Sequence, residues 1–131
     1  MPTRSLNSPV LKWPTPTAVR EAFETWASDL LARRKHVRRV GYFGSLARGD
    51  WGVGSDLDVL VCVSEANQPF FERPSRFDTS PFPVPVDLVV YTEAEWKRLV
   101  AEQRGPARGP VVWYREEALD PAEETRSGPP A

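Results

Sequence analysis

Apolar residues recur at two spacings along this chain, and these spacings predict alternating helices and strands. Near the N-terminus they recur every three or four residues, which is typical of one apolar stripe on a helix of about four turns. This helix can begin at Thr15-Pro16 or at Thr17, because proline is tolerated at the first helical position. The stripe is expected to pack on a sheet and consists of Val19, Ala22, Phe23, Trp26, Leu30 and Leu31.

Short apolar runs predict the strands of that sheet. They cover residues 40–43, 56–63 and 86–91, and residues 111–114 add a final edge strand. The second run is apolar at every position beyond its first acidic residues, as is typical of a central strand.

The segments between the strands predict shorter elements. Residues 46–55 are too few for a full crossover helix, so we expect one helical turn before Gly49 and then a loop. Residues 64–85 contain five prolines and read as a long loop with a short helix around 70–73. Thr92 to Glu95 forms a capping box that opens a last helix, which ends at Gly105-Pro106.

Length and composition fit a single domain. The chain has 131 residues, 40% of them hydrophobic and 27% charged, which is usual for a soluble globular protein. No segment approaches the ~20 apolar residues that span a bilayer, and the first residues lack the apolar core of a signal peptide. We therefore expect a cytoplasmic protein with a flexible arm (1–15), a domain (16–116) and a polar tail (117–131).

Charge and cysteine content limit the function. The single cysteine, Cys62, is expected to be an inert core thiol, and one His with one Cys excludes a structural zinc site. A net charge of −1 argues against a protein that coats nucleic acid. Basic residues nevertheless gather at 33–39, either as a solvated helix end or as a patch for an RNA or an acidic partner.

Two aspartates at the start of the second strand indicate a metal site. Asp56 and Asp58 are two apart, so they point to the same face with Cα atoms roughly 6.6 Å apart. Their carboxylates repel by roughly 2–3 kcal/mol at an effective dielectric near 20. A cation would neutralise both, and oxygen-only ligands favour Mg²⁺.

Further residues complete this constellation if the third strand pairs with the second. Asp87 lies within an apolar strand, where packing alone does not call for a charge. Three carboxylates around one or two Mg²⁺ ions are typical of phosphoryl transfer. Gly44 and Ser45 end the first strand; glycine allows close approach of a phosphate, and serine supplies donors.

These residues carry a resemblance to a known family. Gly44 to Asp50, followed by Ser55 to Asp58, resembles the signature of the DNA polymerase beta-type nucleotidyltransferase superfamily, especially its minimal nucleotidyltransferase (MNT) branch, over roughly residues 16–116. The resemblance implies an α+β nucleotidyltransferase fold, with a small mixed sheet and helices packed on one side.

The resemblance also implies roles for the site residues. Asp56, Asp58 and Asp87 would be the catalytic metal ligands, with Asp87 also activating the nucleophile, and two Mg²⁺ ions are expected. The nucleotide-binding residues would be Gly44, Ser45, Arg48 and Ser55.

The resemblance implies an enzyme that transfers a nucleoside monophosphate to a hydroxyl. The donor is expected to be ATP, which supplies AMP, or another NTP. Minimal members often pair with an all-helical HEPN toxin and modify a tyrosine on it. The resemblance therefore implies that this protein is the antitoxin of such a pair. Too few residues follow Tyr114 to build the helical domain of larger relatives, so we expect a second chain, a HEPN partner or a further copy, to complete the working unit.

Two alternatives stay open at this point. The protein could neutralise a helical partner by docking alone, or it could be an RNA or small-molecule nucleotidyltransferase that uses the basic residues at 33–39. Trp51, in the loop over the site, is expected either to stack on a base, to contact a partner, or to pack as a lid on the end of the sheet.

Overall fold

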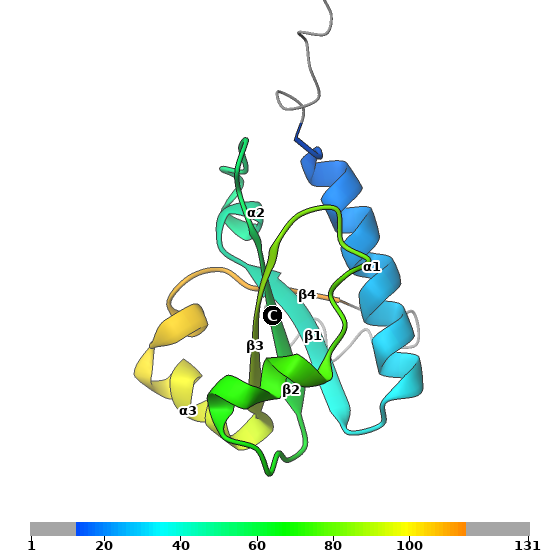
Figure 1. Cartoon of the computed structure of the whole chain (residues 1–131). Helices are drawn as coiled ribbons and strands as arrows, with labels where there is room; N and C mark the ends of the chain where they lie inside the picture. The colour runs from blue at the N-terminus through cyan, green and yellow to red at the C-terminus, as the bar shows by residue number, and fades with distance from the viewer. Residues whose placement is uncertain (1–12, 115–131) are drawn as a thin grey trace, which may run out of the picture.

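A four-stranded mixed sheet forms the centre of the molecule (Figure 1). The computed structural model describes residues 13–114, so the predictions for residues 1–12 and 115–131 lie outside it. The strands lie in the order β3-β2-β1-β4; β1 is antiparallel to β2 and β4, whereas β2 and β3 are parallel. The elements are α1 (Pro16–Arg33), β1 (Val37–Phe43), α2 (Ser45–Arg48), β2 (Leu57–Val63), the 3-10 helix η3 (Phe70–Arg76), β3 (Val86–Thr92), α3 (Glu93–Glu102), the 3-10 helix η4 (Gly105–Arg108) and β4 (Val112–Trp113).

The predicted elements are present, with local capping that agrees with their sequences, but β1 begins earlier than predicted, at Val37, and β2 begins at Leu57, which leaves Asp56 just before the strand. Thr15 caps α1 by accepting a hydrogen bond from the Ala18 N–H at 3.1 Å. Thr92 and Glu95 form both hydrogen bonds of the capping box at α3. The α+β mixed-sheet fold is therefore confirmed.

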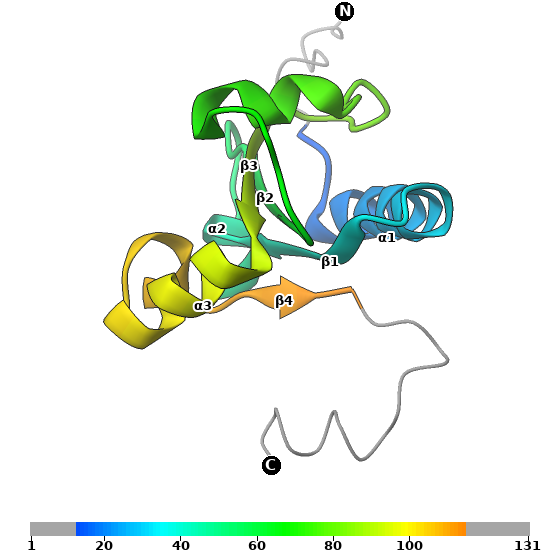
Figure 2. The ribbon, with the colours of Figure 1, turned by 90° about the horizontal axis from the view of Figure 1, so that it is seen from below.

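Helices cover both faces of the sheet, which corrects the expectation of helices on one side. Figure 2 shows α1 and α3 on opposite sides of the strands. The reason lies in β2, whose alternate residues are buried on both faces. Val59 and Val61 belong to the cluster under α1, whereas Leu60 and Cys62 pack with Trp96 of α3. A central strand that is apolar on both faces needs cover on both.

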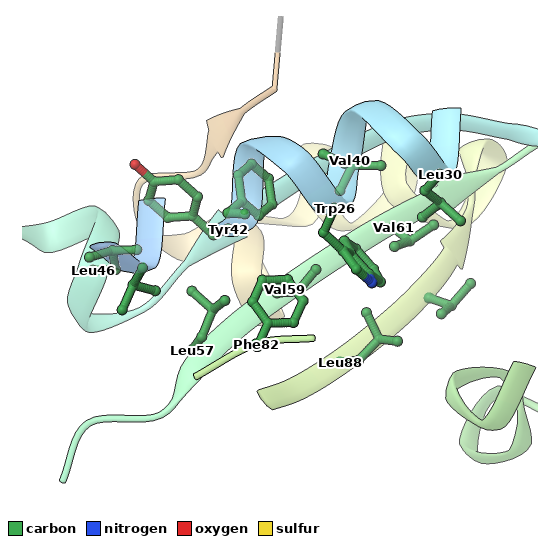
Figure 3. Close-up of a cluster of buried hydrophobic side chains, with 14 of the residues drawn as sticks. Trp26, Leu30, Val40, Tyr42, Leu46, Leu57, Val59, Val61, Phe82 and Leu88 are labelled. Atoms are coloured by element: carbon green, nitrogen blue, oxygen red, sulfur yellow. The ribbon is translucent and has the colours of Figure 1, made fainter. Parts of the chain in front are cut away.

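The larger core lies between α1 and the sheet (Figure 3). Trp26 of α1 packs against Phe82 of the proline-rich loop, with ring centroids 5.2 Å apart. The Trp26 Nε1–H donates to the carbonyl of Asp78 at 2.8 Å, which satisfies the polar atom of a largely buried indole. The long loop is thus fixed to the core by both an apolar and a polar contact.

Arg73 of η3 ties the same loop to β3 and α3. Its side chain is buried, and its guanidinium donates to the carbonyls of Gln68 and Val90 at 3.0 and 3.1 Å. It also donates to both carboxylate oxygens of Glu95, at 2.7 and 3.2 Å. Because buried charges require partners, this set of contacts explains how an arginine can occupy the interior.

The second core confirms the prediction for the cysteine. Cys62 is fully buried beside Trp96, and burial raises the pKa of its thiol to about 12. A thiol that stays protonated at neutral pH is a poor nucleophile. Within residues 13–114, none of the helices has the length and apolar character needed to cross a membrane.

Candidate active site

Asp58 and Asp87 lie side by side at the beginning of the two parallel strands. They are direct partners in the register of β2 and β3, so their side chains project from the same face of the sheet. Asp58 is partly buried and Asp87 is exposed. Further along this face, Leu60 and Cys62 are covered by α3, which leaves the acidic residues at the uncovered end.

The charges of Asp56 and Asp87 both act on Asp58 at this end of the sheet. Burial raises the pKa of Asp58 above its ordinary value, and the negative charges of Asp87 and Asp56 raise it further. Arg48 acts in the opposite direction. Within residues 13–114, no three acidic, histidine or cysteine side chains form a set that could hold a metal ion as they stand. Asp56, Asp58 and Asp87 are therefore neighbours, but not a closed set of ligands.

Gly44 brings the end of β1 directly against Asp58. Its φ of 73° lies in the region that favours glycine. A β carbon at this position would overlap Oδ2 of Asp58 and lie 2.9 Å from its Cγ. The glycine thus makes room for an acidic side chain, a need that the sequence did not reveal. Its predicted contact with a phosphate stays a prediction.

Ser45 and Arg48 lie on the short helix α2, which directly follows Gly44. The Ser45 carbonyl accepts hydrogen bonds from the N–H groups of Gly49 and Asp50, at 3.0 and 3.1 Å. Arg48 forms an exposed ion pair with Asp50, with Nε and Oδ2 3.2 Å apart. The predicted nucleotide contacts of Ser45 and Arg48 stay predictions.

The turn before Asp56 is held by its own serine. The Ser55 hydroxyl accepts a hydrogen bond from the Gly52 N–H at 3.0 Å, and the Ser55 N–H donates to the Gly52 carbonyl at the same distance. Ser55 therefore has a local role in fixing the approach to Asp56. A contact with nucleotide, which the resemblance implied, stays a prediction.

Two tryptophans fasten this turn to the segment before α1. The Trp13 Nε1–H donates to the Ser55 carbonyl at 3.2 Å, and the Trp51 Nε1–H donates to the Pro14 carbonyl at 3.0 Å. Both side chains also pack on the larger core. Packing is thus the role that the structure gives Trp51. The role of Trp13 could not be found from the sequence, because its partner is 42 positions away.

The chemistry of this end of the sheet follows from its donors. Asp56, Asp58 and Asp87 offer oxygen atoms alone, and such a donor set fits a hard divalent cation such as Mg²⁺. The repulsion that Asp87 and Asp56 exert on Asp58 is the second observation that fits a cation, because positive charge would relieve it. Divalent cations held by carboxylates are typical of enzymes that transfer phosphoryl or nucleotidyl groups.

Comparisons with known proteins agree with this class. Residues 25–106 match the nucleotidyltransferase domain family, and because the match spans more than half of the chain, the protein belongs to that family. The matched region includes Gly44 and all three aspartates. The predictions of the superfamily and of a transferase are therefore confirmed at this level.

A solved structure shows the same fold. It belongs to a Sulfolobus solfataricus protein provisionally assigned as a nucleotidyltransferase, determined at 1.40 Å resolution. The two chains share 21% sequence identity with a TM-score of 0.59, over 81% of this chain and 89% of the other. A search of curated proteins gives no significant match.

Proposed function

We propose that the protein is a Mg²⁺-dependent enzyme that transfers AMP from ATP to a hydroxyl group and releases pyrophosphate. The observation that carries the proposal is the register that places Asp58 beside Asp87, with Asp56 close enough to affect the same carboxyl. In this proposal the three aspartates hold Mg²⁺, and Gly44, Ser45, Arg48 and Ser55 contact the nucleotide. The bound metal would supply charge neutralisation and activation of the attacking oxygen.

The exposure of the two paired aspartates supports different roles for them. Asp58 is partly buried against Gly44, so its position is fixed by the backbone. Asp87 is exposed and can be reached by an incoming hydroxyl. Asp87 would therefore accept the proton of the acceptor hydroxyl as its oxygen attacks the α-phosphorus and the bond to pyrophosphate breaks.

Arg48 would bind phosphate after leaving Asp50. Its ion pair with Asp50 is exposed and therefore worth little, so a triphosphate with several negative charges can compete for the guanidinium. Loss of Arg48 should raise the KM for nucleotide more than it lowers kcat.

The exposure of Asp87 leaves room for a protein as the acceptor. We propose a tyrosine on an all-helical partner of the HEPN type, with modification of that tyrosine making this protein an antitoxin. The support is the resemblance to minimal nucleotidyltransferases together with an exposed Asp87 that a second polypeptide could cover.

Label transfer tests this proposal. The full chain is incubated with Mg²⁺, each α-³²P-labelled NTP in turn, and the product of the neighbouring gene as the candidate acceptor. We expect label on a tyrosine from ATP, and a rate lower by about 1,000-fold or more in Asp58→Asn. Asp29→Asn, an exposed aspartate of α1, is the matched control and should retain the rate. Absence of transfer from every NTP, or equal rates in wild type and Asp58→Asn, would contradict the proposal.

Docking without catalysis is the second candidate. The observation that favours it is the exposure of Phe70 and Phe71 on η3, at 41% and 79%. An Asp56→Asn/Asp58→Asn variant distinguishes the two candidates, because a docking antitoxin would still block the partner's activity, whereas an enzymatic one would not.

A further inference from the structure

A second candidate site lies at the opposite end of the parallel strands. Here a cleft of about 260 Å³ is lined by the last residues of β2, the segment after it, and η3. Val63, which lines the cleft, is five residues beyond Asp58, or roughly 16 Å along the strand. Val63 and Val90 also face the α1 side of the sheet, whereas Asp58 and Asp87 face the α3 side. The cleft is thus separate from the carboxylates.

Basic and amide side chains dominate the polar part of this lining: Arg34, His36, Asn67, Gln68, Arg73 and Arg76. Glu65 is the acidic residue among those that line it. Arg73 is neutralised by Glu95, so its charge is already balanced within the protein. Of the other charged residues in the lining, Arg34 and Arg76 are positive and Glu65 is negative. The cleft therefore has an excess of positive charge and favours an anion.

Arg34 is held in place before any ligand arrives. Its guanidinium lies over the ring of Phe77, 4.5 Å from the centroid, and its Nη1–H donates to the Arg76 carbonyl at 3.0 Å. An arginine has five N–H donors in a planar fork, so others stay available on the same group. Binding to such a fixed donor loses less conformational freedom than binding to a mobile surface arginine.

Arg76 is positioned by the same rigid segment. It ends η3, the 3-10 helix that Arg73 fastens to the carbonyl of Val90 and to Glu95. The buried arginine thus fixes the wall of the cleft, which Arg34 and Arg76 both line. Two guanidinium groups at one cleft can both donate hydrogen bonds to the oxygens of a phosphate.

We propose that this cleft binds a phosphate dianion, either free or as the terminal phosphate of a nucleotide. Its volume lies just below the range of pockets that enclose a whole drug-sized ligand, so it has room for a phosphate and for part of an attached nucleoside. The proposal does not depend on the nucleotidyl transfer proposed above, because none of its residues belongs to the acidic site.

Calorimetric titration of the full chain at constant ionic strength tests this site. The probes are inorganic phosphate, AMP and adenosine. We expect saturable phosphate binding that weakens by about tenfold or more in Arg76→Gln, since charge-assisted hydrogen bonds are lost. AMP that competes with phosphate identifies the nucleotide as a second source of the group, whereas adenosine should not bind.

Further variants test whether phosphate binds in this cleft rather than elsewhere on the protein. Arg104→Gln, an exposed arginine paired with Glu102, should bind phosphate like the wild type. Arg34→Gln, with folding verified by circular dichroism, should reproduce the loss seen in Arg76→Gln. The proposal is overturned if phosphate binding is absent, if both cleft variants bind normally, or if Ser45→Ala abolishes binding while Arg76→Gln retains it. Binding of a single-stranded RNA without saturable phosphate binding would also overturn it, in favour of a diffuse electrostatic surface.

Discussion

The two ends of the β2–β3 pair differ in whether their charged side chains are balanced by partners within the protein. At one end, Asp58 lies beside Asp87, and burial and repulsion raise its pKa. At the other end, Arg73 is buried more deeply, yet Glu95 and two carbonyls satisfy it. Hydrogen bonding by Arg73 in turn lowers the pKa of Glu95. Charge that is balanced within the protein stabilises the fold, whereas like charges held together indicate a ligand from outside.

Replacing Arg73 should have the largest effect on stability. Arg73→Met leaves the carbonyl of Val90 without its donor and Glu95 without its ion-pair partner. We expect the free energy of unfolding to fall by ~3 kcal/mol, measured by urea denaturation. Arg104→Met is the control and should change it by less than about 0.5 kcal/mol. A loss in Arg73→Met as small as that of the control would mean that the buried contacts are not stabilising.

Replacing Gly44 should perturb the acidic end through backbone and side chain together. Gly44→Ala requires a positive φ of an alanine and pushes its β carbon into Asp58, so we expect a loss of ~2 kcal/mol in thermal or urea unfolding. Gly54→Ala is the matched control, because its φ is also positive, at 86°, but its β carbon would meet no atom within 4 Å. Equal losses in the two variants would show that the overlap with Asp58 is unimportant.

The pH dependence of stability should have opposite signs at the two ends. Asp58 binds its proton more tightly in the folded state, so the stability it contributes is present below its unfolded pKa near 3.8 and is lost as pH rises through its folded pKa. That loss is absent in Asp58→Asn. Its free energy of unfolding at neutral pH, measured without divalent cations, should therefore exceed that of the wild type, by less than about 1 kcal/mol after solvent screening.

Glu95 supplies the contrasting case. Its lowered pKa means that it contributes stability above its unfolded pKa, near 4.5, and that this contribution is lost as pH falls through the folded pKa. Glu95→Gln should therefore be less stable than the wild type at neutral pH, and the difference should shrink as pH falls through the folded pKa of Glu95. A gain in Glu95→Gln or a loss in Asp58→Asn at neutral pH would reverse the comparison.

Local features of the fold were predictable because they depend on neighbouring residues. The apolar run after Asp58 marked the central strand, and the Thr92–Glu95 capping box marked the start of α3. The two-residue spacing of Asp56 and Asp58 indicated a common site, although Asp56 lies just before β2, so the structure places only Asp58 on the strand.

Contacts between distant residues could not be predicted in the same way. The register of Asp58 with Asp87 joins strands separated by a proline-rich loop, and only their pairing decides it. The burial of Arg73 depends on Val90 and Glu95, 17 and 22 positions away. The apolar run of β2 called for cover on both faces of the sheet, but only the return of α3 decides which element covers the second face.

Direct measurement of metal binding tests the central claim that Asp58 and its register partner share a cation. Mn²⁺, as a spectroscopic substitute for Mg²⁺, is titrated into the full chain with a non-hydrolysable ATP analogue, and free Mn²⁺ is measured by electron paramagnetic resonance. We predict that Asp87→Asn weakens Mn²⁺ binding by about tenfold or more, whereas Asp29→Asn does not. Equal Mn²⁺ affinity in Asp87→Asn and the wild type would contradict the account.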